Sequence, residues 1–170
     1  TEWNVCSVTS YNDFSNNSVL GYANLPYFGN CTMTDNNIQE AVNQWIDGNS
    51  RDVYGHISYW DVSGVTDMSG LFQNAYSFND DISNWDVSNV TNMRYMFYDA
   101  SGFNQDIGSW VVSDASNMWG MFKKATSFNQ NISSWDTSKV TNMQSMFYYA
   151  DAFNQNINTP DDNSAWDVSN

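Results

Sequence analysis

The chain has 170 residues, with 19 acidic against 5 basic side chains and a formal net charge of −14. Nucleic-acid binding requires a basic surface, and the same negative charge opposes attraction to anionic lipid, so we expect neither partner. No apolar run approaches the ~20 residues needed to cross a bilayer, and we therefore expect no membrane insertion of this segment.

Residues 1–33 show no strong periodicity and contain the only two cysteines of the chain, Cys6 and Cys31. In an acidic chain rich in Asn, Ser and Thr, two cysteines so placed predict one disulfide and an oxidising compartment. Closing that loop would stabilise the fold by roughly 3 to 4 kcal/mol. The alternative is a pair of unrelated buried thiols.

Residues 34–48 predict an amphipathic helix with one apolar stripe at i, i+3, i+4, i+7 and i+8, formed by Ile38, Ala41, Val42, Trp45 and Ile46. Thr34 or Asp35 is expected to cap its start, and Gly48 suits the left-handed residue after its end. A helix directly before a repeat array is expected to cover the first open coil. Residues 1–50 are thus predicted to be a disulfide-pinned segment with a capping helix.

Residues 51–170 repeat one phrase about four and a half times with a period of 25 residues, marked by Trp60, Trp85, Trp110 and Trp135, and the last copy reaches Trp166 after a short insertion. A fixed period of this length predicts a solenoid, in which each coil buries its apolar face against its neighbours. The alternation of Trp85 and Val87 predicts a short parallel strand in each coil. The spacing of Met93, Met96, Phe97 and Ala100 predicts a helical turn after it.

The phrase Trp-Asp-Val-Ser-Asn-Val-Thr-Asn-Met-x-x-Met-Phe at 85–97, with Phe-Asn-Gln-x-Ile at 103–107 and 128–132, resembles the BspA-like leucine-rich-repeat surface proteins. It resembles more closely the 25-residue repeat of mycoplasma-type surface lipoproteins. The resemblance covers roughly residues 38–170 and implies a secreted or surface protein of a class often implicated in adhesion. We therefore expect an α/β repeat: a right-handed leucine-rich-repeat-like solenoid in an extracellular or cell-surface protein.

Residues typical of catalysis do not form a recognisable motif. The single histidine, His56, stands at a repeat position filled elsewhere by Asp81, Asp106 and Asn131, which predicts a surface residue. The sequence has no Gly-x-Ser-x-Gly, phosphate loop, His-Glu-x-x-His or Cys-x-x-Cys. We expect neither enzymatic activity nor a cofactor.

One repeat position carries Asp61, Asp86, Asp136 and Asp167, with Val111 interrupting the series. Hydrogen-bonded turn aspartates are the preferred interpretation, and structural calcium is the alternative because stacked carboxylates repel. Four Asn-x-Ser/Thr sequons predict glycosylation if the source secretes through an N-glycosylating pathway, at Asn16, Asn30, Asn89 and Asn131.

Positions that differ between repeats are expected to face outward, and several carry aromatic or basic side chains: Arg94, Tyr95, Tyr98, Trp119, Lys123, Tyr148 and Tyr149. Helical spacing predicts cation–π pairs between Arg94 and Tyr98 and between Trp119 and Lys123. A row of exposed aromatics is typical of a recognition or assembly surface. The alternative is that long side chains shield the row beneath them.

Two functions fit these features. The first is adhesion, or binding of a protein or glycan, through the aromatic row. The second is a structural subunit that packs with copies of itself into an extracellular filament or sheath. It is suggested by the last repeat, which stops at Ser169-Asn170 before its helical half, because an open coil exposes unpaired backbone groups.

Overall fold

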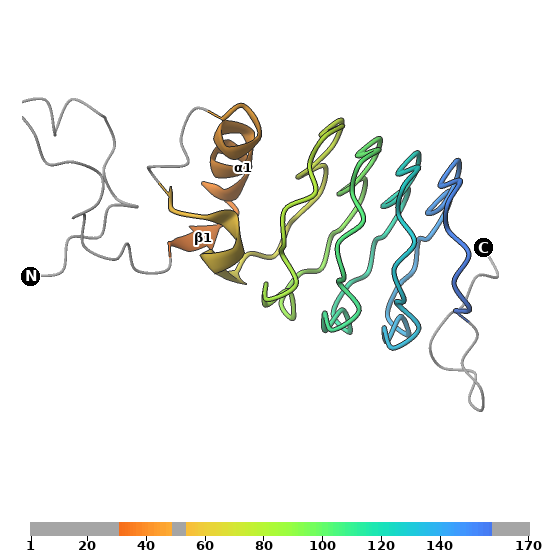
Figure 1. Ribbon diagram of the computed structural model, residues 1–170. Helices are drawn as coiled ribbons and strands as arrows, with labels where there is room; N and C mark the ends of the chain where they lie inside the picture. Colours follow the sequence, from red (N-terminus) through yellow and green to blue (C-terminus); the bar gives the residue numbers. More distant parts are fainter. Residues whose placement is uncertain (1–30, 49–53, 158–170) are drawn as a thin grey trace, which may run out of the picture.

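The structure is a computed structural model that describes residues 31–48 and 54–157. In chain order its elements are strand β1 (Thr32–Thr34), helix α1 (Ile38–Ile46), the 3-10 helix η4 (Ile57–Tyr59) and strand β2 (Asp61–Gly64). β1 and β2 pair in parallel. After β2 the chain continues as a row of similar coils, each beside the next (Figure 1).

Backbone hydrogen bonds join segments that are about one 25-residue period apart. Single parallel bridges link Asp67, Asn92, Asn117 and Asn142 in turn. After each bridge, every second N–H donates to a carbonyl of the next coil at 2.8–2.9 Å, as in the pairs Met93–Asn117, Tyr95–Trp119, Phe97–Met121 and Asp99–Lys123. Residues one period apart are therefore neighbours in space in the described coils.

The segment 93–100 is a series of reverse turns, so the predicted helical turn is wrong in detail. The Met96 N–H donates to the Met93 carbonyl, and the Tyr98 N–H donates to the Tyr95 carbonyl. The alternating N–H groups of Tyr95, Phe97 and Asp99 donate to carbonyls of the next coil. Tyr95 and Asp99 have φ values of 55° and 57°, in the left-handed region. The turns replace a helix because the neighbouring coil supplies the carbonyls that a helix would take from four residues back.

The predicted strand is present in the first coil as β2. In the later described coils, parallel pairing is confined to the single bridges at Asn92, Asn117 and Asn142, and Trp85 and Val87 lie outside them. Alternation of inward and outward side chains is nevertheless kept, because Trp85 and Val87 are buried while Asp86 between them is exposed.

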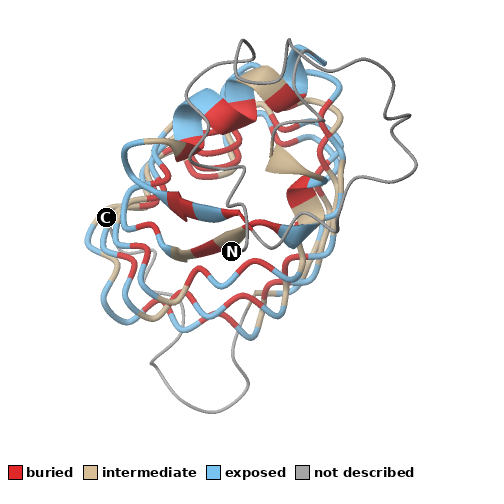
Figure 2. Ribbon diagram, turned by 90° about the vertical axis from the view of Figure 1, so that its left-hand side faces the viewer, coloured by how far each residue is buried: buried red, intermediate tan, exposed pale blue. Residues whose placement is uncertain are grey.

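Aromatic columns fill the interior of the row of coils. One column stacks at centroid distances of 5.3–5.7 Å and consists of Phe72, Phe97, Phe122 and Phe147. A second column beside it consists of Phe78, Phe103, Phe128 and Phe153, spaced at 5.9–6.0 Å. Viewed from the α1 end, buried and exposed residues alternate along the coils (Figure 2).

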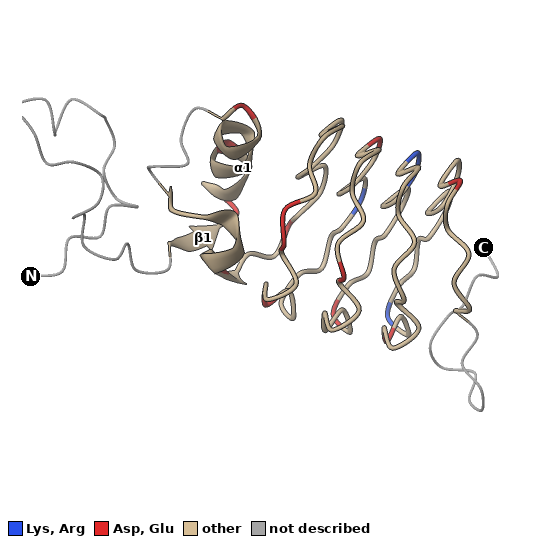
Figure 3. Ribbon diagram, in the orientation of Figure 1, with Lys and Arg blue, Asp and Glu red and all other residues tan. Residues whose placement is uncertain are grey.

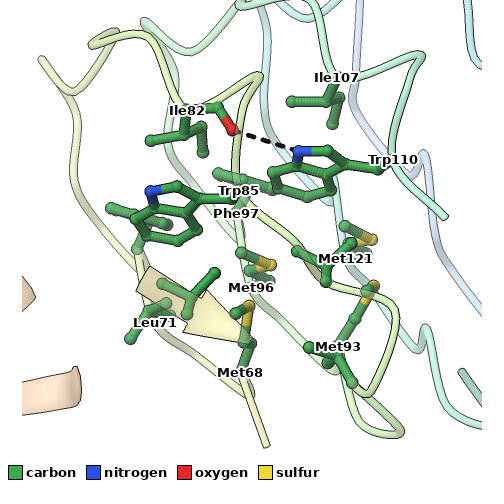
Figure 4. Close-up of a cluster of buried hydrophobic side chains, with 14 of the residues drawn as sticks. Met68, Leu71, Ile82, Trp85, Met93, Met96, Phe97, Ile107, Trp110 and Met121 are labelled. Carbon is green, nitrogen blue, oxygen red and sulfur yellow. Dashed lines mark hydrogen bonds between the residues drawn. The ribbon is translucent and has the colours of Figure 1, made fainter. Parts of the chain in front are cut away.

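The repeated tryptophans Trp60, Trp85, Trp110 and Trp135 are all buried, as the period predicts. Trp110 and Trp135 stack at 6.4 Å with an interplanar angle of 5°. The Trp110 indole N–H donates to the Ile82 carbonyl of the preceding coil at 3.2 Å (Figure 4). Trp85 and Trp135 make the same bond to the preceding coil. The indoles of Trp85, Trp110 and Trp135 thus fill the core and also join two coils.

Helix α1 covers the first coil with its buried residues Ile38, Ala41, Val42 and Trp45, whereas Ile46 is exposed. The Trp45 indole N–H donates to the Asp80 carboxylate at 2.8 Å. The N-cap residue is Asn37 rather than the predicted Thr34 or Asp35, and its side chain does not cap the helix. Gly48 follows the helix with φ 72°, as predicted.

Asp35 caps the coils instead of the helix. Its carboxylate accepts hydrogen bonds from the Thr66 N–H and hydroxyl, each at 2.7 Å, and from the Asp67 N–H at 3.1 Å. One coil later, the Thr91 N–H and hydroxyl and the Asn92 N–H donate to the Thr66 carbonyl. The Asp35 side chain therefore takes the place of the carbonyl that a preceding coil would supply.

This cap predicts a specific dependence of stability on pH. Hydrogen bonds from Thr66, first from its side chain, hold the pKa of Asp35 below its ordinary value. A lowered pKa contributes stability above about pH 4, which is lost as the pH falls through the folded-state pKa. We expect Asp35→Asn to lower Tm at pH 7 and the difference from wild type to shrink by pH 2.

The measurement is thermal unfolding followed by circular dichroism over that pH range. Asp151→Asn, which changes an exposed carboxyl with no hydrogen bond to the described residues, serves as the control for the loss of one surface carboxyl and should leave Tm at pH 7 close to that of wild type. A constant Tm difference between Asp35→Asn and wild type at all pH values would contradict the capping role.

Cys31 is buried and disulfide-bonded. Cys6, Asn16, Asn30 and Asp167 lie outside the described residues. Among the residues that are described, none of the helices has the length and apolarity needed to cross a membrane.

Candidate binding surface

The aromatic strip, defined as Arg94, Tyr95, Tyr98, Trp119, Lys123, Tyr148 and Tyr149, extends over three successive repeats. Its side chains come from the reverse-turn segments, at positions between the inward Met and Phe residues. Tyr148 and Tyr149 are 52% and 58% exposed, and Arg94 is also exposed. The other four are half-buried because they pack on one another.

Ring contacts connect the strip from coil to coil. The Tyr95 ring centroid lies 5.1 Å from that of Tyr98 and 5.1 Å from that of Trp119 in the next coil. Tyr148 and Tyr149 lie 4.2 Å apart. These contacts hold the rings in defined orientations, so ordering them in a complex would cost little side-chain entropy.

The cations of the strip lie over rings, but the predicted pairs are wrong. The Arg94 guanidinium lies 5.0 Å from the Tyr95 ring and 4.3 Å from the Trp119 ring. The Lys123 ammonium lies 5.7 Å from the Tyr98 ring and 5.3 Å from the Tyr148 ring. Pairs at i, i+4 require a helix, and here the stacking of turns brings residues of neighbouring coils together instead.

Gly120 makes room for the Tyr95 ring. It has φ 60°, and a Cβ atom built on it would lie 2.6 Å from Cδ1 of Tyr95. The equivalent residue in the first coil is Gly70, with φ 66° and no ring over it. The absence of a side chain at Gly120 therefore allows Tyr95 to reach Trp119.

Residues 36–160 match the family described as "Mycoplasma protein of unknown function, DUF285". The chain belongs to this family. The match confirms the mycoplasma-type part of the resemblance, and it includes α1 and the whole aromatic strip. No curated protein and no solved structure matches the chain.

In this DUF285 protein the repeated aspartates act as hydrogen-bond acceptors in turns. Asp61, Asp86 and Asp136 each accept the N–H of the serine two residues later, at 3.0–3.1 Å. Hydrogen bonds from these serines lower the pKa of Asp86 and of Asp136. Within the described ranges, no cluster of three or more His, Cys, Asp or Glu side chains is placed to hold a metal ion.

His56 and the sequon residue Asn131 occupy equivalent turns, whereas the sequon residue Asn89 bonds to the preceding coil. His56 is exposed, and its Nδ1 accepts the Ser58 N–H at 3.3 Å, as Asp81 does for Ser83. Asn131 is exposed, and its Oδ1 accepts the Ser133 N–H. The Asn89 amide donates to the Ser63 carbonyl of the preceding coil at 2.9 Å.

Sequence reasoning missed Lys124 and Gly120 in this surface of the DUF285 protein. Lys124 lies 5.6 Å from the Tyr98 ring and 4.0 Å from the Asp99 carboxylate. Gly70 and Gly120 occupy the same repeat position, and a glycine that recurs there indicates a left-handed backbone conformation. This recurrence could have identified Gly120 from the sequence. No comparable signal marked Lys124.

Proposed function

We propose that this protein is a non-enzymatic binding module of the cell surface or extracellular space, and that its aromatic strip contacts a protein or glycan ligand. We further propose that the coils are a leucine-rich-repeat-like solenoid of the BspA-like kind. One observation carries the functional proposal: exposed and half-buried rings and cations from three repeats form one connected cluster on the outside of a regular scaffold.

The chemistry of the strip supports recognition. Tyr, Trp and Arg dominate the binding energy of protein interfaces, because they offer large contact areas together with hydrogen-bond donors. The disulfide-bonded Cys31 supports an oxidising, extracellular location. The acidic side chains Asp86 and Asp136 take part in turns, which supports a structural role over acid–base catalysis.

One observation favours the second candidate, a filament or sheath subunit. In the last described coil, the N–H groups of Met143, Ser145, Phe147 and Tyr149 find no acceptor among the described residues, whereas their equivalents in earlier coils bond to the next coil. A coil added there, from this chain or another copy, would supply the acceptors.

End-to-end stacking of copies would also require an open first coil, and that coil is covered. Asp35 binds Thr66, and the Gln39 side chain donates to the Leu71 carbonyl at 3.3 Å. β1 pairs with β2 on the same coil. We therefore favour the binding module. Sedimentation at increasing protein concentration should show a monomer, and polymers that grow with concentration would support the filament.

The strip predicts that Trp119→Ala and Tyr148→Ala each weaken ligand binding by about tenfold or more. Binding would be measured on arrays of extracellular proteins and glycans, and the Kd of any ligand found there would be determined for each variant. Tyr76→Ala is the matched control, because Tyr76 is 61% exposed and lies outside the strip. Equal binding by all three variants would contradict the proposal, as would an array with no ligand.

A further inference from the structure

We propose that the aromatic strip docks acidic segments of a partner protein, with Arg94 as the anchor for a carboxylate. This inference rests on the proposed function and adds the chemistry of the partner to it.

Basic side chains concentrate at the strip of an otherwise acidic protein. The chain has 5 basic residues, of which Arg94, Lys123, Lys124 and Lys139 lie in the described residues (Figure 3). The first three belong to the strip or adjoin it, and Lys139 pairs with Asp114 at 2.6 Å. An acidic partner is repelled by the net charge of −14 and attracted at the strip, so the charge distribution orients its approach.

Arg94 is prepared to bind a carboxylate. Its guanidinium lies over Trp119 at 4.3 Å, and it forms no salt bridge and no side-chain hydrogen bond with the described residues, although the chain is rich in acids. A guanidinium stacked on a ring keeps the N–H groups of its edge free, and these match a carboxylate in a bidentate arrangement.

Lys123 provides a second cation without an acidic partner in the described residues. Its ammonium lies between the rings of Tyr98 and Tyr148, at 5.7 and 5.3 Å. Rings and cations therefore alternate along the row of coils. This arrangement fits an extended segment in which acidic side chains alternate with apolar ones.

The orientation of the rings favours a polypeptide over a glycan. Sugar rings stack on open, flat aromatic faces, and Arg94 already lies over Trp119. Trp119 is tilted by 39° to Tyr95, and Tyr148 is inclined by 56° to Tyr149, so neither pair forms a flat platform. Ring edges separated by cations are better suited to the side chains of a peptide.

The test uses the full chain and a fluorescent synthetic peptide that alternates glutamate and phenylalanine, with binding measured by fluorescence anisotropy. We expect binding that weakens as salt is raised, because screening reduces the attraction between charges. Arg94→Gln should weaken it about tenfold or more, and Arg94→Lys should have an intermediate effect, because lysine keeps the charge and loses the planar fork. Lys139→Gln, which removes a cation outside the strip, should change Kd by less than about twofold.

Three results would overturn this inference: no binding of the peptide, equal Kd values for Arg94→Gln and wild type, or binding of the carboxylate-bearing glycan hyaluronan in place of the peptide. A ligand from the arrays that depends on Trp119 but not on Arg94 would also overturn it. That last result would leave the proposed function intact, so the failures of the two proposals are distinguishable.

Discussion

Replacing Trp110 with alanine is expected to lower the free energy of unfolding by about 3–5 kcal/mol. Trp110 is 4% exposed and stacks on Trp135, and its ring centroid lies 6.3 Å from that of Phe97. Alanine would leave a cavity between coils and deprive the Ile82 carbonyl of its buried donor. Urea unfolding followed by circular dichroism would measure the loss.

Trp119→Ala is the matched control, because it removes the same side chain from the surface of the same coil. Trp119 is half-buried, and we expect its loss to cost less than about 1 kcal/mol. Trp110→Phe should fall between the two, since it keeps an aromatic ring in the column and loses the hydrogen bond. Similar losses for Trp110→Ala and Trp119→Ala would show that the division into inner and outer tryptophans is wrong.

Gly120→Ala is expected to destabilise the protein by roughly 2–4 kcal/mol. A left-handed alanine costs about 1–2 kcal/mol, and displacing the Tyr95 ring adds an overpacking term of about 1–2 kcal/mol. Gly70→Ala introduces the same backbone strain, but no ring lies over Gly70, so this variant should cost only about 1–2 kcal/mol, the cost of the left-handed alanine. Denaturant unfolding of both variants gives the difference.

A double-mutant cycle isolates the contribution of the ring. In a Tyr95→Ala background, Gly120→Ala should cost no more than Gly70→Ala does. The single variant Gly120→Ala should also weaken ligand binding, because a displaced Tyr95 ring loses its contact with Trp119. An unchanged cost in the Tyr95→Ala background would mean that Gly120 acts through its backbone alone.

The scaffold leaves the strip free to vary. The bonds between coils come from the backbone and from repeated polar side chains: the Oδ1 atoms of Asn79, Asn104 and Asn129 each accept the N–H of the asparagine one coil later, at 2.8–2.9 Å. Arg94, Tyr98 and Lys123 contribute only their backbone groups to this ladder. Their side chains take no part in these hydrogen bonds, so the ladder does not depend on which side chains stand at these positions.

Much of the scaffold was determined by the sequence alone. A 25-residue period assigned Trp85 and Trp110 to the core, and the apolar stripe located α1 closely. The variable positions indicated an exposed row, in which Tyr148 and Tyr149 are exposed while Tyr95, Tyr98 and Trp119 are half-buried. These inferences succeed because every repeat buries the same positions against its neighbours. An apolar residue that recurs at one repeat position therefore identifies a buried position from the sequence alone.

Tertiary structure alone decided how the coils are bonded and which strip residues touch. Segment 93–100 has a helical pattern of apolar residues, yet carbonyls of the neighbouring coil bind its alternate N–H groups and turn it into a series of reverse turns. The same stacking places Arg94 over Trp119 instead of beside Tyr98. It also brings Asp35 to Thr66, 31 residues away. Each of these contacts joins residues about one period or more apart in the sequence, and a pattern read within one repeat carries no information on such distances.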